Sequence, residues 1–97
     1  MSAAGDSVVV ESFEWDARKN ATNARKHGID FADAIIVFSD PTAIALETKR
    51  TYGETRYLIV GRVGSVCMTV VYTIRGERIR IISARRSRTS ERKRYGQ

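Results

Sequence analysis

The side chains best suited to chemistry in this chain are basic, and they include a single histidine. Lys26 and His27 stand side by side at the predicted end of a helix. His27 can serve as a general base or acid near neutral pH, and Lys26 can contact phosphate or transfer a proton. Arg62, Arg80 and Arg85 fall within or at the end of predicted strands. Because the planar guanidinium of arginine matches phosphate oxygens and stays charged, these residues predict a phosphate-binding site.

This set of residues suits metal-free cleavage of RNA. The 2′-hydroxyl of RNA can attack the neighbouring phosphate if the protein supplies a proton acceptor, cations for the developing charge and an acid for the leaving oxygen. Tyr95 can donate a proton or stack on a base. No His, Cys and carboxylate spacing predicts a metal site, and no phosphate-binding glycine loop or nucleophile elbow is present. We therefore expect neither a metal nor a cofactor.

Each of these residues also has a structural interpretation. Lys26 and His27 can simply neutralise the carboxyl end of a helix. Arg80 can be a surface arginine on an open sheet face, although a buried stem with a free head favours a phosphate site. Tyr95 can pack its ring on the sheet, and Trp15, with apolar neighbours, is expected in the core.

The positive charge is concentrated near the carboxyl end. The net charge is +6, and residues 75–94 alone carry nine basic and two acidic side chains. A field of that sign attracts phosphates and acidic protein segments, although the same pattern occurs in solubilising surfaces. We assign a general RNA-binding role to four arginines of this segment: Arg78, Arg86, Arg88 and Arg92.

Length and composition predict one domain over residues 1–97. Cys67 is the only cysteine, so no intrachain disulfide can form. With no apolar leader and no run approaching the ~20 apolar residues of a membrane span, we expect a cytoplasmic protein without a membrane partner.

Two helices are predicted in the amino-terminal half. The first follows Asp16, a good N-cap, and ends before Gly28. The second follows Asp30 and ends near Ser39, because a proline two residues later disfavours helical geometry. A narrow stripe on the first helix favours close packing: Ala17, Ala21 and Ala24.

Three strands with short glycine-containing links predict an antiparallel meander over residues 56–62, 66–74 and 78–85. The flanking elements are shorter. We expect strands at residues 8–10 and 42–47, a loop at 48–53, and a last helix capped by Ser87 or Thr89 and ended by Gly96. The fold class is α+β: two amino-terminal helices, an antiparallel sheet of about four strands and a short carboxy-terminal helix.

An ordered set of short motifs spans nearly the whole chain: Phe13-Glu14-Trp15-Asp16, Lys19, Asn23, Lys26-His27-Gly28, Phe31, Gly53-Glu54, Arg56-Tyr57, Gly61-Arg62, residues 78–86, Glu91-Arg92 and Tyr95. In this order and spacing the set resembles the BrnT toxin family. Residues 1–11 are unmatched, and we expect them to form a flexible extension. Gly96 departs from the pattern, since family members commonly carry an acidic residue there.

The resemblance implies a RelE-like fold and a bacterial ribonuclease toxin that blocks translation. It also implies a BrnA-type antitoxin with a ribbon-helix-helix DNA-binding part, so that operator DNA is bound only through the antitoxin. Two alternatives remain open. The chain can be a non-catalytic basic module that binds RNA or an acidic protein, or an inactive member kept as a corepressor.

Overall fold

The computed structural model describes residues 7–46, 49–51 and 53–96. Its first helix, α1, spans Ala17–His27, as the capping residues predicted. The Asp16 carboxylate accepts hydrogen bonds from the backbone N–H groups of Arg18 and Lys19. At the other end Gly28 takes a left-handed conformation, with φ of 70°, and donates to the Ala24 carbonyl. Both ends of α1 are therefore fixed by interactions within the segment itself.

The second predicted helix exists but changes type along its length. α2 covers Phe31–Ala34, and a 3₁₀ helix, η1, continues over Ile35–Ser39. Asp30 caps α2 by accepting from the Ala32 N–H. η1 ends at Asp40, which is extended as expected for a residue before proline.

The antiparallel meander is confirmed. It consists of β5 (Glu54–Val63), β6 (Val66–Arg75) and β7 (Arg78–Arg86), joined by two tight turns. After β7 the last helix, α3, spans Thr89–Tyr95 and stops at Gly96, with φ of 104°. Its N-cap is Arg88 rather than Ser87 or Thr89, because the Glu91 carboxylate reaches back to the Arg88 N–H.

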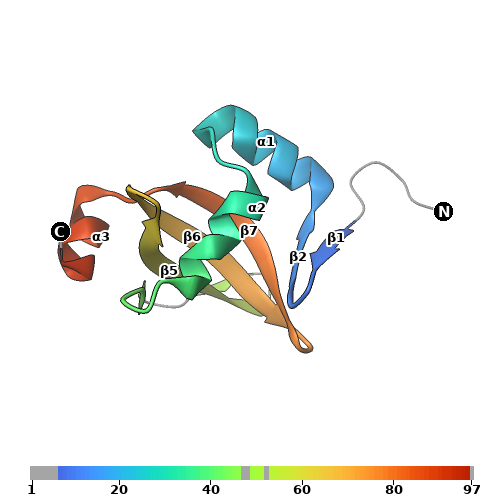
Figure 1. The fold of residues 1–97 in the computed structure, drawn as a ribbon. Helices are drawn as coiled ribbons and strands as arrows, with labels where there is room; N and C mark the ends of the chain where they lie inside the picture. Colours follow the sequence, from blue (N-terminus) through green and yellow to red (C-terminus); the bar gives the residue numbers. More distant parts are fainter. Residues whose placement is uncertain (1–6, 47–48, 52, 97) are drawn as a thin grey trace.

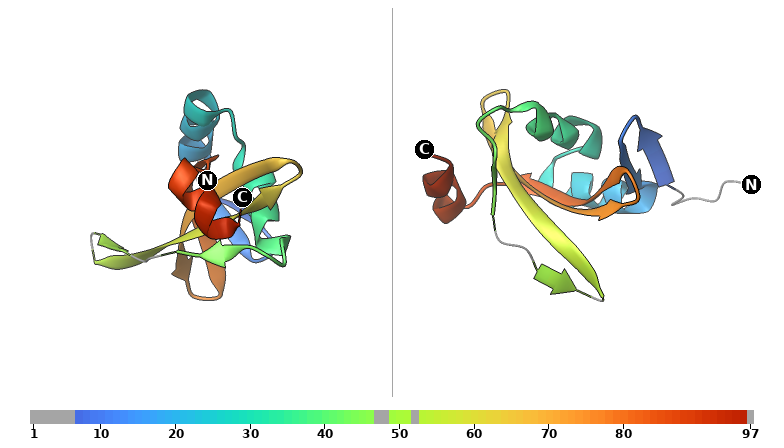
Figure 2. Two further views of the ribbon diagram at one scale, coloured as in Figure 1. Left: turned by 90° about the vertical axis from the view of Figure 1, so that its left-hand side faces the viewer. Right: turned by 90° about the horizontal axis from the view of Figure 1, so that it is seen from below.

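The described sheet has seven strands, where about four were expected. Four short strands add to the three of the meander: β1 (Ser7–Val10), β2 (Phe13–Asp16), β3 (Ile44–Ala45) and β4 (Lys49–Thr51). The sheet order is β1-β2-β7-β6-β5-β3, and β4 pairs with the start of β5 (Figures 1 and 2). The β2–β7 pairing is parallel, so the sheet is mixed.

Three expectations on the flanking segments change. The loop predicted at 48–53 contains strand β4. The strand predicted at 42–47 is confined to Ile44–Ala45, and Glu47 lies outside the described residues. Ser7–Val10 forms β1, which confirms the strand expected at residues 8–10 and shortens the expected flexible extension, while residues 1–6 lie outside the described part.

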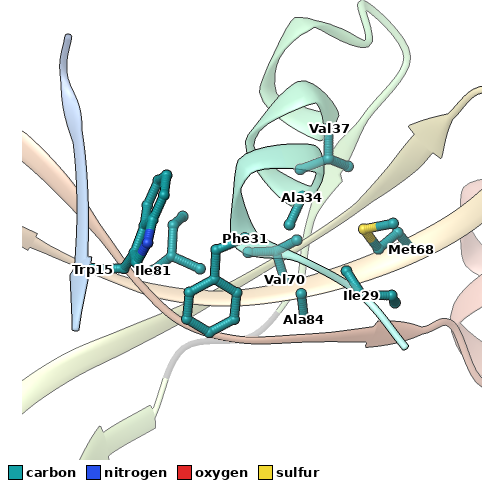
Figure 3. Packing of buried hydrophobic residues seen from close by; sticks show 9 residues of the cluster. All are labelled: Trp15, Ile29, Phe31, Ala34, Val37, Met68, Val70, Ile81 and Ala84. Atoms are coloured by element: carbon teal, nitrogen blue, oxygen red, sulfur yellow. The ribbon is translucent and has the colours of Figure 1, made fainter. Parts of the chain in front are cut away.

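The core lies between one face of the sheet and the α2–η1 segment. Figure 3 shows Phe31, Ala34 and Val37 reaching toward Val70 and Ala84 of the sheet. Trp15 is buried in this cluster, as expected, and its ring meets Phe31 edge to face. The alanine stripe of α1 packs only in part: Ala17 and Ala24 are half-buried, Ala21 is exposed, and the buried residue of α1 is Asn23.

α3 packs on the opposite face of the sheet, at the far end from the β1–β2 hairpin (Figure 1). Met68 and Val70 face the core, so by strand alternation Thr69 faces α3, where it meets Glu91. Within the described residues, no helix is both long and apolar enough to cross a membrane.

Candidate active site

A pocket of about 300 Å³ lies between α1 and the middle of β7. Among the described residues, its walls carry four basic side chains, three neutral polar ones, one isoleucine and no acidic side chain: Arg18, Lys19, Thr22, Asn23, Lys26, His27, Ile82 and Ser83. Cations without a lining carboxylate make this hollow suited to an anionic ligand.

The α-helical repeat places these groups in one wall. Arg18, Thr22 and Lys26 are spaced by four residues, so they lie on one side of α1. Lys26 and His27 occupy the last turn, where cations are favoured by the helix dipole. The sequence therefore identified two neighbours that the structure brings to one pocket, together with Arg18 and Lys19, which the sequence argument did not select.

Asn23 fixes α1 against the sheet. Its side-chain amide donates to the carbonyls of Ala84 and Ile29, and its oxygen accepts from the Ala84 N–H. The side chain thus pairs with the edge of β7 beyond the point where β2 stops. This contact sets the distance between α1 and the Ile82–Ser83 floor of the pocket.

Arg80 does not have the free head that the sequence suggested. Its Nη1 atom lies 2.7 Å from the Glu14 carboxylate and donates also to the Ser7 hydroxyl. Glu14 is the direct register partner of Arg80 in the parallel β2–β7 pair, so the two side chains share a face. An ion pair with both side chains less than a fifth exposed holds the guanidinium.

Arg85 is held even more firmly. Its two terminal nitrogens bind both oxygens of Glu91, at 2.7 and 2.8 Å. The same carboxylate accepts from Thr69 and from the Arg88 N–H. Hydrogen bonding to Arg85 lowers the pKa of Glu91 to about 2, and the carboxylate in turn raises the pKa of Arg85. Arg85 therefore ties α3 to the sheet.

Arg62 and Tyr95 belong to a separate cluster around Asp40. The Asp40 carboxylate accepts from the Tyr95 hydroxyl, the Arg62 N–H, and both the N–H and hydroxyl of Thr42. The Tyr95 hydrogen bond, with those from Arg62 and Thr42, holds the pKa of Asp40 well below its ordinary value, while the carboxylate raises the pKa of Tyr95. β6 separates Arg62, on β5, from the strand that floors the pocket.

Gly61 makes this second cluster possible. A Cβ atom there would lie 2.8 Å from Val37 Cγ2 and 3.1 Å from an Asp40 oxygen. The missing side chain lets η1 and the following loop approach β5, which brings Asp40 onto the Arg62 N–H.

The four general RNA-binding candidates lie on β7 and α3. Arg78 donates to the Glu11 carbonyl, and Arg92 donates to the Ser87 carbonyl. Arg86 and Arg88 are exposed. Arg78 lies at the β6–β7 turn, the other three lie at the opposite end of β7 and at α3, and none of the four lines the pocket of α1.

Three acidic residues hold the candidate residues, and none of them was predicted to do so from the sequence: Glu14 and Glu91 bind the side chains of Arg80 and Arg85, and Asp40 binds the Tyr95 hydroxyl and the Arg62 backbone N–H. One signal was present for Glu91, which stands three residues after the N-cap Arg88, as in a capping box. Asp40 stands two residues before Thr42, a spacing typical of an Asx turn. For Glu14 we find no local signal, since its partner is 66 residues away.

Among the described residues, no group of three or more His, Cys, Asp or Glu side chains converges on one point. A family model described as the ribonuclease toxin BrnT of type II toxin–antitoxin systems matches residues 15–91. No curated protein matches the chain significantly.

Proposed function

Because the chain belongs to the BrnT family of ribonuclease toxins of type II toxin–antitoxin systems, we propose that it cleaves RNA at the pocket between α1 and β7. The observation that carries this proposal is the pocket lining, which combines Lys26 and His27 with two further cations and no acidic side chain. Such a lining attracts a phosphodiester and holds an imidazole, a side chain that can accept or donate a proton.

The proposed reaction needs no metal ion, because RNA carries its own nucleophile. The 2′-oxygen attacks phosphorus, the 2′-hydroxyl proton passes to a base, and the 5′-oxygen leaves with a proton from an acid. Lys26 and His27 supply the proton-transfer groups and part of the positive charge. Arg18 and Lys19 contact the neighbouring phosphates and hold the strand along α1.

The other candidates take a secondary place in this proposal. Arg80 and Arg85 are bound to Glu14 and Glu91, so either can reach a phosphate only by exchanging its carboxylate. Arg62 with Tyr95 forms a second basic and hydroxyl-bearing cluster on β5 and α3 that can contact RNA beyond the pocket.

The ion pairs of Arg80 and Arg85 with carboxylates also favour a second candidate function. A chain whose sheet arginines are neutralised by carboxylates can bind RNA or a partner without cutting. In that case the protein is a non-catalytic basic module or an inactive corepressor.

Variants of α1 distinguish these functions. His27→Gln and Lys26→Gln should each lower the rate of RNA cleavage about 100-fold or more, the usual contribution of a proton-transfer group. Arg25→Gln is the matched control, because Arg25 is an exposed neighbour on the same helix outside the pocket lining. Cleavage by both pocket variants at the control rate would place the site elsewhere. RNA binding without cleavage by the unaltered protein would support the non-catalytic module.

Membership in a type II toxin family implies a cognate antitoxin and an RNA substrate. We propose a BrnA-like antitoxin with a ribbon-helix-helix part, which would carry the complex to operator DNA, and messenger RNA, free or on the ribosome, as the substrate in the cytoplasm. Expression without the antitoxin should arrest growth and protein synthesis. Normal growth with folded protein accumulating would contradict the toxin proposal.

The antitoxin should cover the basic surface of residues 75–94, since acidic side chains and phosphates seek the same arginines. Association should slow as salt rises, because screening limits the field to about 10 Å at 0.1 M. Reversing the charge of Arg88, Arg92 and Arg94 together should reduce the association rate, measured by stopped-flow mixing. An association rate that depends on neither salt nor the charge reversal would show that the antitoxin binds another surface.

A further inference from the structure

The core face of the sheet carries two successive apolar rows across the same four strands. The inner row joins Val8, Trp15, Ile81 and Tyr72 on β1, β2, β7 and β6. The next row toward the turns joins Val10, Phe13, Ile79 and Ile74 on the same strands. Because directly paired residues share a face, this second set, here called the end row, continues the core surface.

The two rows differ in what covers them. Trp15 and Ile81 are buried to 3% and 1% exposure. In the end row, Val10 and Ile74 are 38% and 55% exposed. The core face has therefore more apolar surface than the described residues of the chain cover.

The covering layer stops between these rows. η1 ends at Ser39, and its Phe38 ring lies 5.1 Å from Phe13 and 5.0 Å from Tyr72. Phe38 thus covers the inner edge of the end row. Val10 and Ile74, at the two ends of that row, stay exposed. An added helix beside η1 would extend the same layer over the end row.

The dimensions of the end row suit such a helix. Its outer members lie on β1 and β6, three strand spacings apart, or roughly 14 Å. At 1.5 Å per residue, an α-helix places apolar side chains at i, i+3, i+7 and i+10 over about 15 Å. Charged residues of both signs border the end row: Glu11, Arg75, Glu77 and Arg78. An apolar centre with a mixed polar rim is typical of a specific protein interface.

We propose that the end row is the apolar anchor site for an amphipathic helix of the antitoxin. This inference rests on the proposed toxin–antitoxin pairing and adds to it the surface that holds the complex together. The basic segment speeds association, and the end row limits dissociation. The pocket of α1 involves a different part of β7, so substitutions in the end row leave the pocket residues themselves unchanged.

The test uses three aspartate variants of the full chain and measures their binding to the purified BrnA-like antitoxin. Ile74→Asp and Val10→Asp alter opposite ends of the end row. Val9→Asp is the matched control, because Val9 is 52% exposed on the same strand as Val10 but points to the other face. Thermal melts verify folding, and RNA cleavage by each variant alone should equal that of the unaltered protein.

Ile74→Asp and Val10→Asp should each weaken binding about 10- to 100-fold, mainly through faster dissociation, and Val9→Asp should change it less than twofold. The inference would be overturned if both end-row variants bound the antitoxin as tightly as the unaltered protein. It would also be overturned if Val9→Asp weakened binding as much as the end-row variants do. If a variant unfolds, hydrogen exchange of backbone amides is measured instead on the unaltered protein, free and bound to the antitoxin. Binding should slow exchange over residues 72–81, and unchanged exchange there would count against the site.

Three further outcomes separate this inference from its premise. Loss of a toxin dimer in the end-row variants, with antitoxin binding intact, would assign the end row to self-association and overturn the proposal. Failure of the unaltered protein to bind the antitoxin would overturn both the pairing and the anchor. Tight, end-row-dependent binding by a protein that does not cleave RNA would support the anchor and contradict only the proposed activity.

Discussion

Replacing Glu91 with glutamine should destabilise the protein by about 3 kcal/mol at pH 7. Glu91 is 7% exposed and binds Arg85 through both oxygens, with further hydrogen bonds from Thr69 and the Arg88 N–H. Lowering its pKa from 4.5 to about 2 corresponds to about 3 kcal/mol at roughly 1.36 kcal/mol per pH unit. Glutamine keeps the shape but leaves Arg85 without its counter-charge.

The pH dependence gives a second measure of the same quantity. Because the folded-state pKa of Glu91 is depressed, its contribution is complete above pH 4.5 and is lost as the pH falls toward 2. Urea unfolding of both proteins at pH 7, 5, 4 and 3 should therefore show a difference that shrinks on acidification. Other titrating groups, Asp40 among them, occur in both proteins and cancel in the difference.

The control is Glu77→Gln, a change in the exposed β6–β7 turn that should cost less than about 0.5 kcal/mol. A loss below about 1 kcal/mol for Glu91→Gln at pH 7 would refute the proposed role of the carboxylate. So would a difference between the proteins that stays constant down to pH 3.

The remaining predictions concern packing and chemistry. Asn23→Ala should cost about 2–3 kcal/mol in urea unfolding, because it leaves the N–H and carbonyl of Ala84 unpaired at a buried edge; an unchanged midpoint would contradict this. Gly61→Ala should cost about 1–3 kcal/mol, since the new Cβ meets Val37 Cγ2 at 2.8 Å, and the same change should cost less when made in a Val37→Ala background. RNA cleavage should persist in excess chelator, because the proposed reaction uses side chains alone; activity restored only by magnesium would rule out that mechanism.

Local sequence signals predicted the elements that depend on neighbouring residues. Asp16 and Gly28 fixed both ends of α1, and glycine at the two tight links predicted the β5–β6–β7 meander. Gly64 and Gly76 adopt positive φ in those links, a conformation that glycine reaches without strain. Each of these interactions spans a few residues, so it can be recognised without knowledge of the fold.

The rest of the sheet depends on distant partners. β2 becomes a sheet strand by pairing with β7, more than 60 residues away. β4 is a strand of three residues paired to the start of β5, in a segment whose composition favours a loop. Short segments of this kind gain their hydrogen bonds only when the longer strands are in place.

For the site, the sequence by itself determined the residue types: a basic carboxyl end, one histidine beside a lysine, and arginines on strands. The tertiary structure decided which of these cations meet a carboxylate. Arg80 and Arg85 lie against Glu14 and Glu91, whereas Lys26 and His27 line a pocket without an acidic side chain. The reason is that a charge interacts with whatever the fold brings within a few ångströms, and sequence spacing does not set that distance.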